Sequence, residues 1–264
     1  MLGLVAGGAA VAGSCAISTR QEVELGQQYA AEVNRQLPVV EDAEINRYIN
    51  LLGERIARQG TRNIRYTFYV VNIDAVNAFA LPGGFVYVNR GLVERTDNLA
   101  ELAGVVAHEI GHVEERHGVE QLERVQRANL GLTLAYVLLG RAPGSLERAG
   151  IDVLGTAVFA KFSREAENEA DAVAVRLLTD ARIDPNGLVT FFKELLEERE
   201  RQPNILEQWF STHPLTEERI AATRELIRQT KLPSDLIVDS EQYRSFKARV
   251  RQLPEPPPEF RTAR

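Results

Sequence analysis

The stretch His108-Glu109-Ile110-Gly111-His112 lies inside a run of residues with helical periodicity, from 97 to 117. At about 100° per residue, His112 lies about 40° round the helix from His108 and one turn further along, so both imidazoles can bind one metal ion. Glu109 lies beside that arc, where a carboxylate can act on a metal-bound water without binding the metal. This spacing predicts a zinc hydrolase, and the alternative is two buried histidines on an ordinary core helix.

A catalytic zinc ion needs a third protein ligand and a fourth position that water can occupy. Residues 163–171, Ser-Arg-Glu-Ala-Glu-Asn-Glu-Ala-Asp, predict a second helix. Glu167 and Asp171 fall within about 40° of each other beside its apolar arc, whereas Glu165 and Glu169 lie about 160° away. We therefore expect Glu167 as the third ligand, the alternative being a partly exposed helix residue, and Glu165 and Glu169 as surface charges.

The other two histidines fall outside this pattern. His117 lies about 140° round from His112 on a continuous helix, at the end where the helix dipole favours a cation, so we expect a structural or surface residue. His213 precedes Pro214, which favours an extended backbone. Its surroundings are equally compatible with an ordinary loop residue and with a site residue.

The composition indicates a globular protein that does not bind nucleic acid. Hydrophobic residues make up 44% of the 264 residues, and 31 basic against 37 acidic residues give a net charge of −6 without a cluster of Lys and Arg. Cys15 is the only cysteine, so an intrachain disulfide is impossible.

The first residues are typical of a secretory signal. Residues 2–17 are small, apolar and uncharged, and they are too short and too rich in Gly and Ala for a membrane span. The sequence at 12–15, Ala-Gly-Ser-Cys, resembles a bacterial lipoprotein cleavage box, although no Lys or Arg precedes it and Ala12 replaces the usual larger aliphatic residue. We expect Cys15 to carry a lipid, and the alternative is an apolar leader with an incidental thiol.

The periodicity of the whole chain predicts an α+β fold, mostly helical with a small three-stranded sheet. The predicted helices and strands are helices within 21–59 with a break at Leu37-Pro38, strands at 65–72, 77–81 and 84–88, helices at 97–117, 119–162, 164–180, 187–200 and 216–230, and a loop at 211–215. We expect a leader and tether at 1–20, one domain at 21–250 and a Pro-rich mobile tail at 251–264.

Four ordered motifs carry a family resemblance: NAFALPGG at 77–84, HEIGH at 108–112, ENEAD at 167–171 and STHPLTEER at 211–219. With them the chain resembles, from about residue 25 to 230, the gluzincin metallopeptidases that include the HtpX heat-shock protease, the CAAX prenyl endopeptidases and the small Oma-type envelope lipoprotein proteases. The resemblance implies a zincin-like metallopeptidase domain with one Zn²⁺ per chain.

The resemblance also implies residue roles. Glu167 is then the third zinc ligand after His108 and His112, Glu109 is the general base, and Asp171 orients the zinc site or donates a proton. His213 and Arg219 fall in a segment near the metal, where a histidine can stabilise the transition state or occupy the open position on zinc.

These observations predict a zinc endopeptidase that cleaves unfolded or misassembled envelope proteins through a zinc-activated water, in the bacterial periplasm and attached to the outer membrane by its lipid. We expect the substrate to pair as an extended strand with Asn77, Ala78, Phe79 and Ala80, because an edge strand can hold many sequences. The alternative is a chaperone or adaptor whose zinc is a closed folding staple with His213 as its fourth ligand. Glu109 has little purpose in that closed site, which favours the enzyme.

Overall fold

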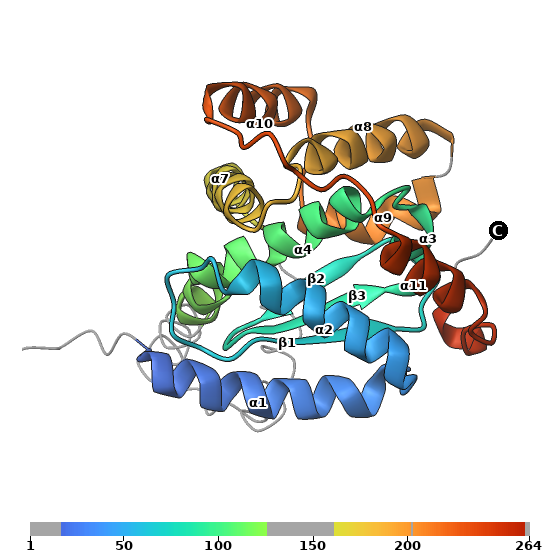
Figure 1. Ribbon diagram of the computed structural model, residues 1–264. Coiled ribbons are helices and arrows are strands. Elements are labelled where there is room, and N and C mark those ends of the chain that lie inside the picture. The colour runs from blue at the N-terminus through green and yellow to red at the C-terminus, as the bar shows by residue number, and fades with distance from the viewer. Residues whose placement is uncertain (1–16, 126–160, 202, 262–264) are drawn as a thin grey trace, which may run out of the picture.

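The computed structural model describes residues 17–125, 161–201 and 203–261, so Cys15 and most of the helix predicted at 119–162 lie outside the described residues. Its helices and strands are α1 (Thr19–Gln36), α2 (Ala43–Ala57), β1 (Thr67–Val71), β2 (Ala78–Leu81), β3 (Phe85–Asn89), α3 (Arg90–Arg95), α4 (Leu99–Glu114), α7 (Arg164–Asp180), α8 (Asn186–Arg201), α9 (Pro203–Thr212), α10 (Glu217–Gln229), α11 (Glu241–Arg251) and a 3-10 turn at Pro258–Phe260 (Figure 1). The prediction of a mostly helical α+β fold with a small three-stranded sheet is confirmed.

The sheet has the order β1-β3-β2, with β1 parallel and β2 antiparallel to β3. Its side chains alternate between two apolar layers. Phe68, Val86 and Val88 share one core with α2 and α4, whereas Phe79 and Tyr87 face the other side with α1. Because β2 is the last strand in the order, it is an edge of the sheet, as the sequence predicted. The face of β2 toward α4 carries the small side chains of Ala78 and Ala80.

Helix α4 lies between the sheet and an outer layer formed by α7, α8 and α10 (Figure 1). All of its residues from Leu99 to Glu114 are buried, because neighbouring elements cover every side of it. The sequence predicted this helix from residue 97, but it begins at Leu99, where the Asn98 side chain caps it by accepting a hydrogen bond from the Glu101 amide. Thr96 lies at the end of α3.

Three helices were missed in the sequence. They are α3, α9 and α11. Helix α9 contains Ser211 and Thr212, which were predicted as loop, and it begins with a proline, as helices often do. Helix α11 buries Tyr243, Phe246 and Val250, a helical spacing that could have been read from the sequence.

The segment predicted as a mobile tail makes specific contacts as far as it is described, to Arg261. Arg90 donates to the carbonyl oxygens of Leu253 and Pro254 at 3.2 and 2.9 Å, and Asn72 donates to Pro254 at 3.1 Å. These bonds tie the segment to the residues that follow β1 and β3. Among helices in the described ranges, none combines the length and apolarity needed to cross a bilayer.

Helices α4 and α7 approach each other closely at Gly111. A Cβ atom at Gly111 would lie 2.6 Å from the carbonyl oxygen of Ala170, and that backbone atom cannot move away without separating the two helices. The missing side chain therefore sets the distance between α4 and α7. Gly118 provides a comparison, because a Cβ there would meet Pro82 at an ordinary 3.4 Å.

We expect Gly111→Ala to lower the free energy of unfolding by about 1–3 kcal/mol, the usual cost of overpacking, in spite of the better helix propensity of alanine. Urea unfolding in EDTA measures it without a contribution from bound metal. Gly118→Ala is the matched control and should leave stability unchanged or raise it. Equal stabilities of the two variants would contradict this account of the helix contact.

Candidate metal centre

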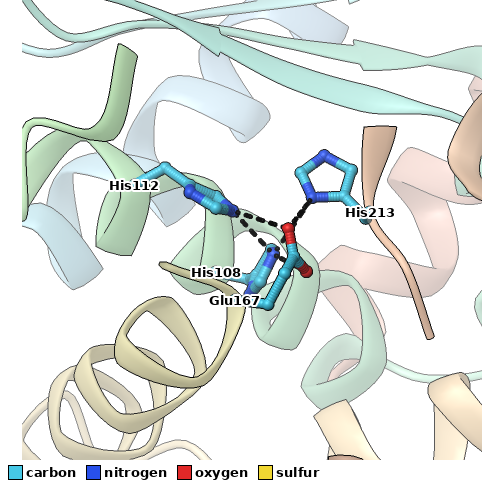
Figure 2. A group of neighbouring side chains, drawn as sticks. All are labelled: His108, His112, Glu167 and His213. Carbon is cyan, nitrogen blue, oxygen red and sulfur yellow. Dashed lines mark hydrogen bonds and ion pairs between the residues drawn. The ribbon is translucent and has the colours of Figure 1, made fainter. Parts of the chain in front are cut away.

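Four side chains from three separate segments converge on one point (Figure 2). His108 and His112 extend from α4, Glu167 from the first turns of α7, and His213 from the residue after α9. One nitrogen or oxygen atom of each lies within 4.8 Å of the corresponding atoms of the others, and all four side chains are buried. The structure thus brings together the three predicted ligands and the histidine whose role the sequence left open.

The distances between these atoms fit a tetrahedral metal ion. The Nε2 atoms of His108 and His112 are 3.1 Å apart, and Glu167 lies 3.6 and 3.5 Å from them. Nδ1 of His213 is 3.4 Å from His108 Nε2 and 3.0 Å from Glu167 Oε1. Zinc bonds of about 2.0–2.1 Å place tetrahedral ligand atoms about 3.3 Å apart. Three imidazoles and one carboxylate are also ligand types that zinc prefers.

The protonation states of the buried ligands suit metal binding. Burial holds the pKa of His112 well below its usual value, so its imidazole is neutral and has a lone pair to give. Burial by itself would raise the pKa of Glu167, but His213, His112 and Arg219 outweigh it and bring that pKa well below the usual value. Glu167 is therefore an ionised carboxylate in the interior.

Asp171 and Arg219 form a buried ion pair behind His108. Nε and Nη2 of Arg219 donate to the two oxygens of Asp171 at 2.7 Å each, and Nη1 contacts Glu167. Asp171 Oδ1 lies 2.8 Å from His108 Nδ1, and the Thr223 hydroxyl donates to Oδ2 at 3.1 Å. Although burial acts to raise it, Arg219 lowers the pKa of Asp171 to about 2. Asp171 thus orients the His108 ring from behind, a contact typical of metal-binding histidines.

Glu109 lies beside the ligand group and is fully buried. Its Oε1 accepts no hydrogen bond from the described residues, and the nearest histidine nitrogen, Nε2 of His213, is 3.5 Å away. Burial raises the pKa of Glu109, against the attraction of His213 and His108. A carboxylate with raised proton affinity and an unbonded oxygen is suited to accept and release a proton.

The sequence predicted His117 as a structural or surface residue away from the ligands. It is not a surface residue. The His117 side chain is buried, and its Nδ1 lies 2.9 Å from Nδ1 of His112. Glu169, predicted as a surface charge, is 61% exposed, yet its Oε2 lies 3.0 Å from Nε2 of His117. The exposed carboxylate therefore reaches a buried histidine of the site.

Aromatic rings that the sequence reasoning did not single out enclose the site. Phe162 stacks on His112 with ring centres 4.0 Å apart, and Trp209 lies 4.7 Å from His213. Phe192 lies under the Arg219 guanidinium at 4.7 Å. Trp209 on α9 precedes His213 by four residues, a spacing that could have indicated their contact.

The predicted substrate-binding residues occupy β2 and the residue before it. Asn77 is buried, and both atoms of its side-chain amide have no hydrogen-bond partner among the described residues. Ala78 and Ala80 lie on the face toward α4, whereas Phe79 points to the α1 side and stacks on Tyr87. Ala80 lines a small cavity together with His112 and Phe162.

A second group of carboxylates lies at the opposite end of α4. Asp97, Glu101 and Glu194 have oxygen atoms within 4.8 Å of one another. Glu101 accepts bonds from the Asp97 amide, Asn98 and Thr190, so the structure already satisfies it. Burial, together with the charges of Glu101 and Asp97, raises the pKa of Glu194 to about 7. We assign this group no metal.

The fold and the ligand group define a zincin-like metallopeptidase of the gluzincin class, with two histidines one turn apart on one helix and a glutamate on another. Residues 41–227 match the sequence profile of peptidase family M48, and the chain belongs to this family. The predictions of a zinc metallopeptidase and of the family resemblance are thereby confirmed.

Known relatives agree with this assignment. The chain is 33% identical over 245 residues to the beta-barrel assembly-enhancing protease of Escherichia coli K12, covering 89% of this chain and 49% of the relative. It is 30% identical over 230 residues to the metalloprotease LoiP of the same strain, covering 84% and 87%. It is 30% identical over 186 residues to the mitochondrial metalloendopeptidase OMA1 of Schizosaccharomyces pombe, covering 70% and 54%. The chain thus spans about half the length of the beta-barrel assembly-enhancing proteases.

The carboxylate group at Glu194 makes stability depend on pH. The pKa of Glu194 in the folded protein, about 7, exceeds the value of about 4.3 in an unfolded chain, so the folded state binds more protons between these values and stability falls as pH rises through them. We expect Glu194→Gln to be more stable than the wild type at pH 8 and to lose this part of the pH dependence. Lys247, the nearby cation that lowers this pKa, remains in both proteins.

Urea unfolding at pH 5 and pH 8 measures this difference. Glu200→Gln, an exposed position on the same helix, is the matched control and should keep the wild-type pH dependence. A Glu194→Gln variant with wild-type stability at both pH values would rule out the coupling.

Proposed function

We propose that this protein is a zinc-dependent endopeptidase in which His108, His112 and Glu167 hold the metal and Glu109 is the general base. The observation that carries the proposal is the convergence of these three ligands from α4 and α7. Beside them lies a buried carboxylate oxygen of Glu109 that has no hydrogen-bond partner among the described residues. A zinc ion held there supplies a Lewis acid that polarises the scissile carbonyl and lowers the pKa of water toward neutrality.

The chain's own residues then move the proton. Glu109 accepts a proton from the attacking water and delivers it to the leaving amine, a role that its raised pKa favours. Asp171 holds the proton on Nδ1 of His108, so that Nε2 keeps its lone pair. Arg219 fixes Asp171 and balances its charge.

We propose that His213 contributes to this reaction by carrying a positive charge or donating a hydrogen bond. Burial acts to lower its pKa, but Glu167 and Glu109 outweigh burial and raise it. A protonated or hydrogen-bonding imidazole at this position can stabilise the negative charge that develops on the carbonyl oxygen.

We further propose that the substrate binds as an extended strand along β2. A strand at the edge of the sheet has backbone groups that can pair with a peptide, and Ala78 and Ala80 leave room on the face toward the ligands. The side-chain amide of Asn77, which has no hydrogen-bond partner in the part of the chain that the structure describes, supplies one more hydrogen-bonding group just before β2. Backbone pairing recognises many sequences, which suits unfolded or misassembled substrates.

The relatives named beta-barrel assembly-enhancing protease support envelope proteins as substrates and the bacterial periplasm as the location. We propose that Cys15, which lies outside the described residues, carries a lipid that attaches the protein to the outer membrane. Mass spectrometry of the protein from its native membrane would contradict this if Met1 proved to be the unmodified N-terminus.

A second function, a zinc-stapled chaperone or adaptor, is favoured by one observation. His213 lies within bonding range of the ligand group, where it can close the fourth position and leave no place for water. In that case zinc stabilises the fold and Glu109 has no reaction to serve.

We expect Glu109→Gln to keep its zinc, because Glu109 is not a ligand, and to lose at least about 100-fold in kcat/KM for unfolded casein, because the general base is gone. Metal analysis and a casein cleavage assay, each with and without chelator, measure both quantities. Glu115→Gln, an exposed glutamate at the end of α4, is the matched control and should retain activity. Undiminished cleavage by Glu109→Gln would contradict the assignment.

We expect His213→Ala to retain zinc on its three remaining ligands and to change the rate of cleavage. An increase identifies His213 as a blocking ligand of a latent enzyme, and a decrease identifies it as a group that stabilises the transition state. Weakened zinc binding together with no cleavage by either the variant or the wild type would support the staple instead. Zinc competition with a chelator and the casein assay distinguish these outcomes.

A further inference from the structure

We propose that His117 and Glu169 are positioning residues that fix the ring orientation and the proton of His112 for zinc binding. The proposal rests on the zinc site proposed above, because it assigns His112 as a ligand. It adds two residues that lie outside the HEIGH motif and that make no contact with the point where the ligands converge.

The geometry is a continuous chain from the surface to the metal site. Glu169 Oε2 lies 3.0 Å from His117 Nε2, His117 Nδ1 lies 2.9 Å from His112 Nδ1, and His112 Nε2 lies 3.1 Å from His108 Nε2. The two imidazoles are buried, and Glu169 is exposed at the outer end. The two links that involve His117 are within hydrogen-bonding distance.

Metal binding at Nε2 of His112 selects one direction of the hydrogen bonds among these three groups. An ionised carboxylate only accepts, so Nε2 of His117 carries a proton and donates it to Glu169. A neutral His117 then has a lone pair on Nδ1, which accepts from Nδ1–H of His112. His112 is left with its lone pair on Nε2, the atom that faces the other ligands. The opposite direction would put a proton on that atom and prevent metal binding.

A left-handed residue brings His117 to this position. Arg116 has φ of 62°, which ends α4 and turns the chain back, and its amide bonds to the carbonyl of Val113 at 3.1 Å. Such a conformation is costly for a residue with a side chain, and the bond from Arg116 Nε to the buried Glu22 at 3.0 Å helps to hold it. His117 therefore lies beside His112, although a continuous helix would place it on another face.

The arrangement gives each histidine ligand on α4 an acceptor behind it. His108 has Asp171 directly, at 2.8 Å from its Nδ1. His112 has His117, with Glu169 behind. Phe162 stacks on the His112 ring and prevents the ring from tilting out of its plane. The hydrogen bond at Nδ1 then has to fix only the rotation of the ring within that plane. Partners of this kind raise metal affinity by about 10–100-fold.

The test compares His117→Ala, Glu169→Ala and Glu169→Gln with Glu165→Ala, a control that removes an exposed carboxylate from the same helix. Chelator competition measures zinc affinity, and the visible spectrum of the Co²⁺-substituted protein reports the ligand geometry. We expect His117→Ala to weaken zinc binding about 10–100-fold and to alter the cobalt spectrum. Glu169→Ala should change both in the same direction and by less, and Glu169→Gln, whose amide oxygen still accepts, should approach the wild type.

Unchanged zinc affinity and an unchanged cobalt spectrum in both His117→Ala and Glu169→Ala would overturn the proposal. If His117→Ala does not fold, the two variants of the exposed Glu169 decide, because a merely structural role would not make Gln differ from Ala in the cobalt spectrum. A wild-type protein that binds no zinc would instead refute the proposed function, so the two failures are distinguishable.

Discussion

The ion pair between Asp171 and Arg219 is the interaction on which the site depends, because it holds three chain segments around buried charge. Arg219 comes from α10, Asp171 from α7, and Asp171 in turn contacts His108 on α4. Breaking a buried pair by removing one partner typically costs about 3–5 kcal/mol, since the other charge stays in the interior. Glu109, Glu167 and Asp171 are all buried near this one guanidinium, and a divalent cation is the counter-charge that such a group of carboxylates requires.

The fold supplies precision through close packing. Helix α4 is covered by the sheet on one side and by α7 and α8 on the other, and Gly111 lets α7 approach until Glu167 reaches both histidines. Strand β2 turns into β3 through Gly83 and Gly84, both with positive φ, which keeps the edge strand beside the same helix. The strand edge that we propose for peptide binding therefore lies against the helix that carries two of the metal ligands.

Much of the site could be predicted from the sequence because helical angles are nearly constant. The angles brought His108 to His112 and separated Glu167 from Glu165, and the structure places these residues accordingly. The same rule failed for His117, because Arg116 ends the helix in a left-handed conformation, which an arginine in the sequence does not predict. His213 could not be decided either, since its position depends on the packing of α9, a helix that the sequence reasoning did not identify. Contacts between distant segments, such as that of Glu169 with His117, have no local signal.

The complete burial of α4 limits how far its motif can be transplanted. A helix with no side facing water would expose apolar residues such as Val105, Val106 and Ile110 if it were placed on a surface or synthesised as a free peptide, and it would aggregate rather than fold. Its five-residue signature therefore has chemical meaning only with the surrounding layers present. A design that uses this metal site must therefore include the sheet and the outer helices together with α4.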